Sequence, residues 1–144
     1  MTENEKKKAI NSVMCWLLFG IIFVTAPSLF HYAYRSIVGF NDNLADYLPD
    51  LLLVVASVCC NLINIVVDSE KSVKHLLRWI ISICFGLIGI ACWLLYALCR
   101  FVDDFGVDNK FIIDFAPNAL GVSVIIIIIN AVIGCIIEIV TAKK

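Results

Sequence analysis

The sequence predicts an all-α integral membrane protein, a bundle of four transmembrane helices that forms one domain over residues 1–144. The first observation is composition: 62% of the residues are hydrophobic and the mean hydropathy is +0.98. Soluble globular chains are nearer about 45–50% apolar. The second observation is segmentation, because short polar stretches separate long apolar runs over about 9–34, 46–68, 75–101 and 114–140. A helix of about 20 residues crosses a hydrocarbon core of about 30 Å, so each run can span a bilayer.

The first span, 9–34, follows three consecutive lysines and contains Pro27 about two-thirds of the way along. Proline lacks the backbone N–H that a regular helix needs, so we expect a kink there. A basic start and an apolar run are also features of a secretory signal. We expect this segment to be retained instead, because proline follows its only small-residue exit, Thr25-Ala26, and the apolar run continues through Phe30.

The second span, 46–68, carries polar residues on one side. Their spacings of 4, 7, 4, 3 and 4 keep them on one helix face, which consists of Asp46, Asp50, Ser57, Asn61, Asn64 and Asp68. An asparagine in a bilayer needs a hydrogen-bond partner, and an interhelical bond contributes about 0.6–2 kcal/mol. Two interpretations follow. The mid-span residues Ser57, Asn61 and Asn64 either hold helices or protomers together, or line a water-filled path.

The third and fourth spans carry further marked faces. Ser82, Gly86 and Gly89 in span 75–101 are small residues at a spacing that permits close packing of helices. Span 114–140 carries one face formed by Ser123, Asn130, Gly134 and Glu138. Glu138 lies near the C-terminal end of its helix, where the helix dipole disfavours an anion. Either its side chain reaches the interface or a lysine, or it takes part in proton or cation coupling.

Three aspartates precede or open the second and fourth spans: Asp46, Asp50 and Asp114. We expect them to cap or charge-stabilise the helix N-termini, with cation binding as the alternative. The segment DFAPN at 114–118 also matches DYLPD at 46–50, at an offset of 68 residues. A tandem, parallel repeat of a two-span hairpin would produce this match, as would chance similarity between apolar segments.

Basic residues predict the orientation of the chain. Eight of the eleven lysines and arginines fall on one side of the predicted topology, and Arg35, Arg100 and Lys110 fall on the other. The positive-inside rule then places both termini in the cytoplasm, as a multi-pass protein of the bacterial inner (plasma) membrane. The cytoplasmic basic face comprises Lys71, Lys74, Arg78, Lys143 and Lys144. It can dock a cytoplasmic protein partner or hold anionic lipid.

Motifs for chemistry are missing from the sequence. All seven cysteines lie in or beside apolar runs, and neither a C-x-x-C pair nor a zinc-ligand spacing occurs, so we expect packing roles for them. We find no nucleophile–base pair, phosphate-binding loop or dinucleotide motif. We therefore expect a protein that is not an enzyme, has no cofactor and no metal, and does not bind nucleic acid directly.

In its four-span architecture the chain resembles the small membrane subunits of bacterial phage-defence systems such as Kiwa. That resemblance implies a membrane sensor that works with a cytoplasmic effector. We therefore expect a homo-oligomeric membrane scaffold or sensor, in contact with the lipid bilayer and with a cytoplasmic partner. The alternative is an ion channel, small-ion carrier or pore-forming protein lined by the polar faces of spans two and four.

Overall fold

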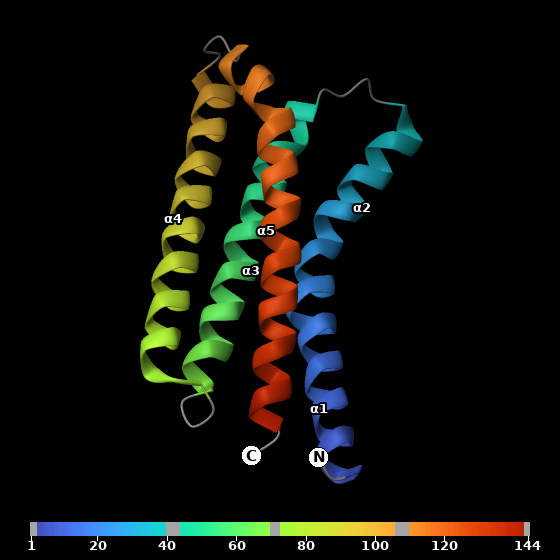
Figure 1. Ribbon diagram of the computed structural model, residues 1–144. Helices are drawn as coiled ribbons and strands as arrows, with labels where there is room; N and C mark the ends of the chain where they lie inside the picture. Colours follow the sequence, from blue (N-terminus) through green and yellow to red (C-terminus); the bar gives the residue numbers. More distant parts are fainter. Residues whose placement is uncertain (1–2, 40–43, 70–72, 106–109, 143–144) are drawn as a thin grey trace.

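A computed structural model describes residues 3–39, 44–69, 73–105 and 110–142, and all regular elements in these ranges are helices (Figure 1). Four helical stretches are long and apolar enough to cross a membrane: Glu3–Val38, Leu48–Asp68, His75–Val102 and Ile112–Ala142. The predicted all-helical architecture with four spans is therefore confirmed. By helix length and hydropathy, this is a multi-pass membrane protein.

The first span consists of three helical segments. α1 (Glu3–Cys15) leads into a π-helix, η1 (Trp16–Ile22), which is followed by α2 (Phe23–Val38). The helix begins earlier than the predicted residue 9, because residues of the polar tail are also helical. In this tail, Lys7 Nζ lies 3.9 Å from a carboxylate oxygen of Glu3, one helical turn away. Pro27 lies inside α2, and the hydroxyl of Thr25 donates to the carbonyl of Ile22 at 3.1 Å.

α2 leans away from the other helices toward its C-terminal end (Figure 1). The change of helix type in η1 and the proline in α2 are both recognised causes of helix bending. α2 ends at Gly39, whose φ of 79° lies in the left-handed region that favours glycine at a helix C-terminus. No residue of α2 is buried in the single chain.

α3 (Leu48–Asp68) is the central helix of the bundle. A 3₁₀ turn, η2 (Leu44–Tyr47), precedes it, and Pro49 occupies its first turn, where the missing N–H costs little. α3 contacts the first span, α4 (His75–Phe105) and α5 (Lys110–Ala142). Its fully buried side chains are Leu48, Val55, Val58, Cys59, Leu62 and Val66. The apolar core of the chain is therefore organised around the second span.

α4 and α5 flank α3 in different ways. α4 packs mainly on α3, whereas α5 packs on both α3 and α1, so the first and last spans lie side by side. Figure 1 shows the start of α1 and the end of α5 at one end of the bundle, together with the end of α3 and the start of α4. α5 begins four residues before the predicted 114, at Lys110, and α4 extends to Phe105.

The outward faces of the bundle are strongly apolar. Ile83, Leu87 and Ile90 of α4, and Ile125 and Ile128 of α5, are each more than half exposed in the single chain. Water would not tolerate apolar faces of this extent on a monomeric protein, whereas a bilayer solvates them at no cost. These faces therefore contact lipid.

Candidate functional site

The mid-span polar residues of α3 lie on the side that faces the first span. The side-chain amide of Asn61 donates to the backbone carbonyl of Gly20 in η1 at 3.5 Å. The Ser57 hydroxyl instead donates to the Leu53 carbonyl of its own helix at 2.8 Å. Asn64 is exposed one turn beyond Asn61. Of the three, Asn61 makes an interhelical bond and Ser57 an intrahelical one.

A cleft of about 250 Å³ lies between α3 and the junction of α1 with η1. Its lining residues are Cys15, Trp16, Phe19, Gly20, Asn61, Asn64 and Ile65. The two asparagine amides are the polar part of an otherwise apolar wall. This cleft lies in the half of the span nearer the chain termini, because Asn61, Asn64 and Ile65 belong to the last two turns of α3, which ends at Asp68.

His31 and Asp50 connect α2 to α3 at the opposite end of the bundle. His31 Nδ1 lies 2.6 Å from a carboxylate oxygen of Asp50, with the two side chains 42% and 40% exposed. The ring of Tyr47 contacts His31 and Tyr32, with centroid distances of 6.3 and 5.0 Å, and the guanidinium of Arg35 lies 6.0 Å from its centroid. We call these five residues the α2 contact cluster.

Two clefts meet at Asp50. The larger, of about 360 Å³, lies between α2 and α3 and is lined by Val24, Pro27, Ser28, His31, Asp50, Leu53, Val54 and Ser57. The smaller, of about 130 Å³, is lined by Ser28, Leu29, Tyr32, Tyr47, Asp50, Leu51 and Leu120. The Asp50 carboxylate is thus accessible from both. In the described ranges, no group of three or more His, Cys, Asp or Glu side chains is placed to hold a metal ion.

The polar face of α5 is split between the core and the periphery. Asn130 is completely buried and Ser123 nearly so. The amide nitrogen of Asn130 donates to the Ile126 carbonyl at 2.9 Å and approaches the sulfur of Cys59 on α3 at 3.8 Å, while its carbonyl oxygen has no hydrogen-bond partner. Glu138 is partly buried. Asn130 therefore lies at the α3–α5 contact, on the other side of α3 from the first-span clefts.

Glycines mark the closest helix contacts. On α4, a Cβ at Gly89 would lie 3.5 Å from Cys59 and one at Gly86 would lie 3.8 Å from Ile63, so this face packs on α3. On α5, a Cβ at Gly134 would overlap the indole ring of Trp16. The indole nitrogen of Trp16 also donates to the Ala131 carbonyl at 3.4 Å. Trp16 is therefore buried between the first and last spans.

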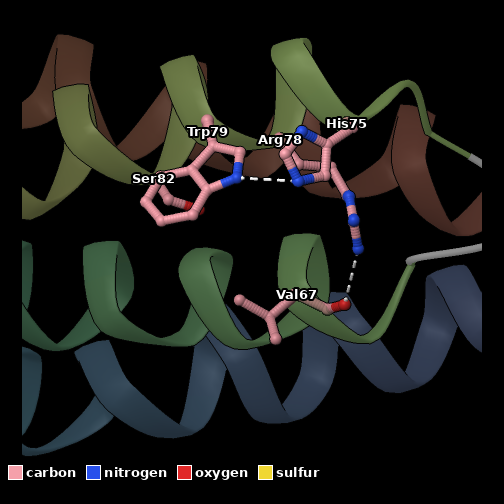
Figure 2. Close-up of a pocket in the computed structure, with 5 residues that line it drawn as sticks. All are labelled: Val67, His75, Arg78, Trp79 and Ser82. Carbon is pink, nitrogen blue, oxygen red and sulfur yellow. Dashed lines mark hydrogen bonds between the residues drawn. The ribbon is translucent and has the colours of Figure 1, made fainter.

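A fourth cleft, of about 330 Å³, lies at the α3–α4 end of the bundle (Figure 2). We call it the end cleft, and its lining residues are Val67, His75, Arg78, Trp79 and Ser82. The Arg78 guanidinium donates to the Val67 carbonyl at 3.4 Å, and Trp79 Nε1 donates to His75 Nε2 at 3.0 Å. Ser82, predicted as a packing residue of α4, thus lines this cleft.

Of the three aspartates expected to cap or charge-stabilise helix N-termini, Asp50 lies in the first turn of α3, whereas Asp46 and Asp114 do not occupy the N-caps of α3 and α5. Tyr47 occupies the N-cap position of α3 and makes no side-chain capping bond, while Asp46 lies in η2 and Asp50 in the first turn of α3. Asp114 lies inside α5, because residues from Lys110 onward extend that helix, so it is not at the N-cap. The two copies of the Asp-Pro element therefore differ locally, and the tandem repeat stays a prediction.

Part of the predicted basic face can be located. Lys74 precedes α4 and Arg78 lies in its first turn, both at the end of the bundle that carries the termini. Lys71, Lys143 and Lys144 lie outside the described residues.

Comparisons with protein-family models, with curated proteins and with solved structures found no match to this chain.

Two features of these sites were not predicted from the sequence. The first is the pairing of His31 with Asp50, because residues on separate helices carry no spacing signal. The second is the burial of Trp16, for which a signal did exist. Gly20 follows Trp16 by four residues, so a large ring and a missing side chain share one helix face.

Proposed function

We propose that this protein is a non-enzymatic membrane scaffold and sensor whose responsive element is α2. The supporting observation is that α2 belongs to a membrane span yet buries no residue against the rest of the chain. Polar and aromatic contacts of the α2 contact cluster connect it to α3 instead. An element held in this way can change position without disrupting the apolar core.

The hinge for such a movement lies next to α2. The π-helix η1 and Pro27 interrupt the regular hydrogen bonding of the first span on either side of the start of α2. At the first residue of η1, Trp16 fixes the span to α5. A ligand, lipid or protein that separates His31 from Asp50 would therefore move α2 while α1 stays in place.

The output of the sensor would be at the basic end of the bundle. We propose that both termini are cytoplasmic, because eight of eleven basic residues belong to that end, and that the chain works as a homo-oligomer in the bacterial inner membrane. We propose that the positive charges of Lys71, Lys74, Lys143 and Lys144 attract an acidic cytoplasmic partner. The role as a phage-defence sensor follows from the four-span resemblance alone.

Charge reversal tests the docking part of this proposal. In cells that naturally make the protein, a variant with these four lysines changed to glutamate should insert normally but lose partner recovery in affinity purification. The control reverses Arg100 and Lys110 at the opposite end. Equal recovery from both variants would refute docking, and a solubilised protein of protomer mass would refute the oligomer.

The second candidate function is a channel or small-ion carrier. The observation that favours it is that Asp50, Ser57, Asn61 and Asn64 of α3 all line clefts toward the first span, in both halves of the membrane. Flux of K⁺ or H⁺ across liposomes containing the purified protein tests it. If Asn61→Leu, which removes a polar group between the two clefts, leaves any measured flux unchanged, this path is not the route.

A further inference from the structure

We propose that the two clefts that meet at Asp50 bind a cationic amphiphile through its primary ammonium group. This inference rests on the proposed function in one respect, because it names the class of ligand that α2 would sense. The larger cleft, of about 360 Å³, lies between α2 and α3, and the smaller measures about 130 Å³. Asp50 and Ser28 line both clefts, so a carboxylate and a hydroxyl mark the point where they join.

The polar groups at this junction can accept hydrogen bonds from a ligand. His31 Nδ1 contacts one carboxylate oxygen of Asp50 at 2.6 Å. Among the described residues, the second carboxylate oxygen has no protein partner, and neither has the Ser28 hydroxyl. When His31 is neutral and donates from Nδ1, its Nε2 is a further acceptor. An ammonium group has three N–H donors and no acceptor, so it matches this set.

The charges around the junction also favour a cation. The ionised carboxylate of Asp50 carries one negative charge, and its side chain is 40% exposed. The positive end of the α3 dipole is equivalent to about half an elementary charge, so it reduces this negative charge without cancelling it. Two other charged residues of this region, Arg35 and Asp46, have opposite signs and line neither cleft.

The walls of the larger cleft indicate that the cation carries an apolar body. Val24 and Pro27 of α2 face Leu53 and Val54 of α3 across it. A hard metal ion such as Ca²⁺ takes about six to eight oxygen ligands, which this wall does not offer. An organic ammonium compound matches both the carboxylate and the apolar wall, and a cleft of this volume is of the size that holds small molecules.

The depth of the clefts favours a free amphiphile over a membrane lipid. Asp50 lies in the first turn of the span Leu48–Asp68, at headgroup depth, and Ser57 lines the larger cleft two turns further into the membrane. A bound ammonium group would therefore lie at the interface with its chain directed inward. Phosphatidylethanolamine would bring its phosphate close to the Asp50 carboxylate, where two negative charges repel each other.

Native mass spectrometry of the full chain, purified in a neutral detergent, tests the proposal with decylamine as the probe. We expect a saturable decylamine adduct and about tenfold weaker binding of decanol, because hydrogen bonds with a charged partner are the stronger ones. Asp50→Asn should weaken decylamine binding about tenfold for the same reason. Asp114→Asn is the matched control, since Asp114 is an exposed aspartate of α5 that lines neither cleft, and it should bind like the wild type.

A second variant covers the case in which Asp50→Asn fails to fold. Ser28→Leu fills the junction of the two clefts without changing charge, and it should also weaken decylamine binding. Wild-type binding of decylamine by either variant would overturn the proposal. Equal binding of decylamine and decanol by the wild type would also overturn it, and that comparison needs no variant. Displacement of decylamine by an equal concentration of phosphatidylethanolamine would assign the clefts to a membrane lipid instead.

Hydrogen exchange separates this site from the proposed sensor. An ammonium group between Ser28 of α2 and Asp50 of α3 adds a connection between the two helices. Decylamine should therefore slow amide exchange in α2 of the wild type but not of Asp50→Asn. Saturable binding with unchanged exchange would support the site and refute α2 as the responsive element. Decylamine binding no tighter than that of decanol would refute the site, and α2 would then respond to a different ligand.

Discussion

The indole of Trp16 occupies the space that two glycines leave open, Gly20 on its own helix and Gly134 on α5. In a bilayer, helices gain no hydrophobic free energy by leaving lipid for one another, so close van der Waals contact is a main source of attraction. A large aromatic ring between two positions without side chains makes many such contacts. This residue triplet therefore carries much of the association between the first and last spans.

Gly134→Ala should destabilise the protein by about 1–3 kcal/mol, because the new Cβ overlaps the Trp16 ring and forces it to move. The thermal midpoint of the detergent-solubilised protein measures the effect. Gly121→Ala is the control on the same helix, since no atom lies within 4 Å of its Cβ position. That change should be neutral or stabilise by up to about 1 kcal/mol. Equal thermal midpoints for the two variants would disprove that the Trp16 ring fills the space at Gly134.

Asn130 tests how strictly the α3–α5 contact excludes charge. Asn130→Asp removes the donor to Ile126 and introduces a carboxylate at a completely buried position. A carboxylate near the centre of a spanning helix costs about 2.5–3.5 kcal/mol, so we expect a loss of that order in stability toward denaturing detergent. Asn64→Asp, at an exposed site, should lose far less. Similar losses of stability in the two variants would show that the Asn130 site is not buried in the folded protein.

The role of a residue could be predicted only where the spacing of residues within one helix is sufficient to indicate it. Gly86 and Gly89 share one face of α4, and that face lies against α3. The stripe of α3 was recognisable from its spacing, but the acceptor of Asn61, the Gly20 carbonyl, belongs to a helix 41 residues away in the chain. A partner on another helix depends on helix packing, which periodicity does not encode.

At the scale of elements, α2 differs from the other membrane segments. The remaining spans bury residues against α3 or α5, whereas α2 buries none. Its connection to the bundle is polar, and exposed ion pairs contribute little to stability. The element least supported by packing is also the one beside a π-helix and a proline.

His31→Ala should therefore change mobility more than stability. We expect a loss in overall stability of no more than about 1 kcal/mol, because the His31–Asp50 pair is partly exposed. Amide hydrogen exchange in α2 should nevertheless become faster, since its polar link to α3 is lost. Tyr34→Ala, at an exposed position of the same helix, is the control and should leave exchange in α2 unchanged. Unchanged exchange in His31→Ala would show that the pair does not restrain α2.

The sequence predicts that four spanning helices exist, but it does not predict the residues at which they begin and end. Four apolar runs predicted four spans, which length and hydropathy confirm. The helices are longer than the predicted spans because flanking residues continue them, such as the polar Glu3–Lys7 and the largely apolar Lys110–Ile113. The π-helix was missed since Trp16–Ile22 has an ordinary apolar composition. Pro27 predicted an irregularity in the first span, and the π-helix lies shortly before it in the sequence.

At the scale of the whole molecule, the chain ends and the α3–α4 connection share one end of the bundle (Figure 1). If that end is cytoplasmic, a fluorescent protein fused to either terminus should fluoresce. Alkaline phosphatase inserted at residues 106–109 should be active, because that segment would be exported. Inactive phosphatase at this position, with active phosphatase at the C-terminus, would reverse the orientation.

The contact between Trp16 and α5 has a consequence for biogenesis. Trp16 and its acceptor Ala131 are 115 residues apart, so the first helix to leave the ribosome meets its main packing partner only when the last helix has been made. Until then, the chain in the membrane holds α1 without its docking surface. Proteases that degrade incompletely folded membrane proteins would therefore have access to the N-terminal helix for longer than to the other helices. This access would end when the fourth helix has been made and packs on the first.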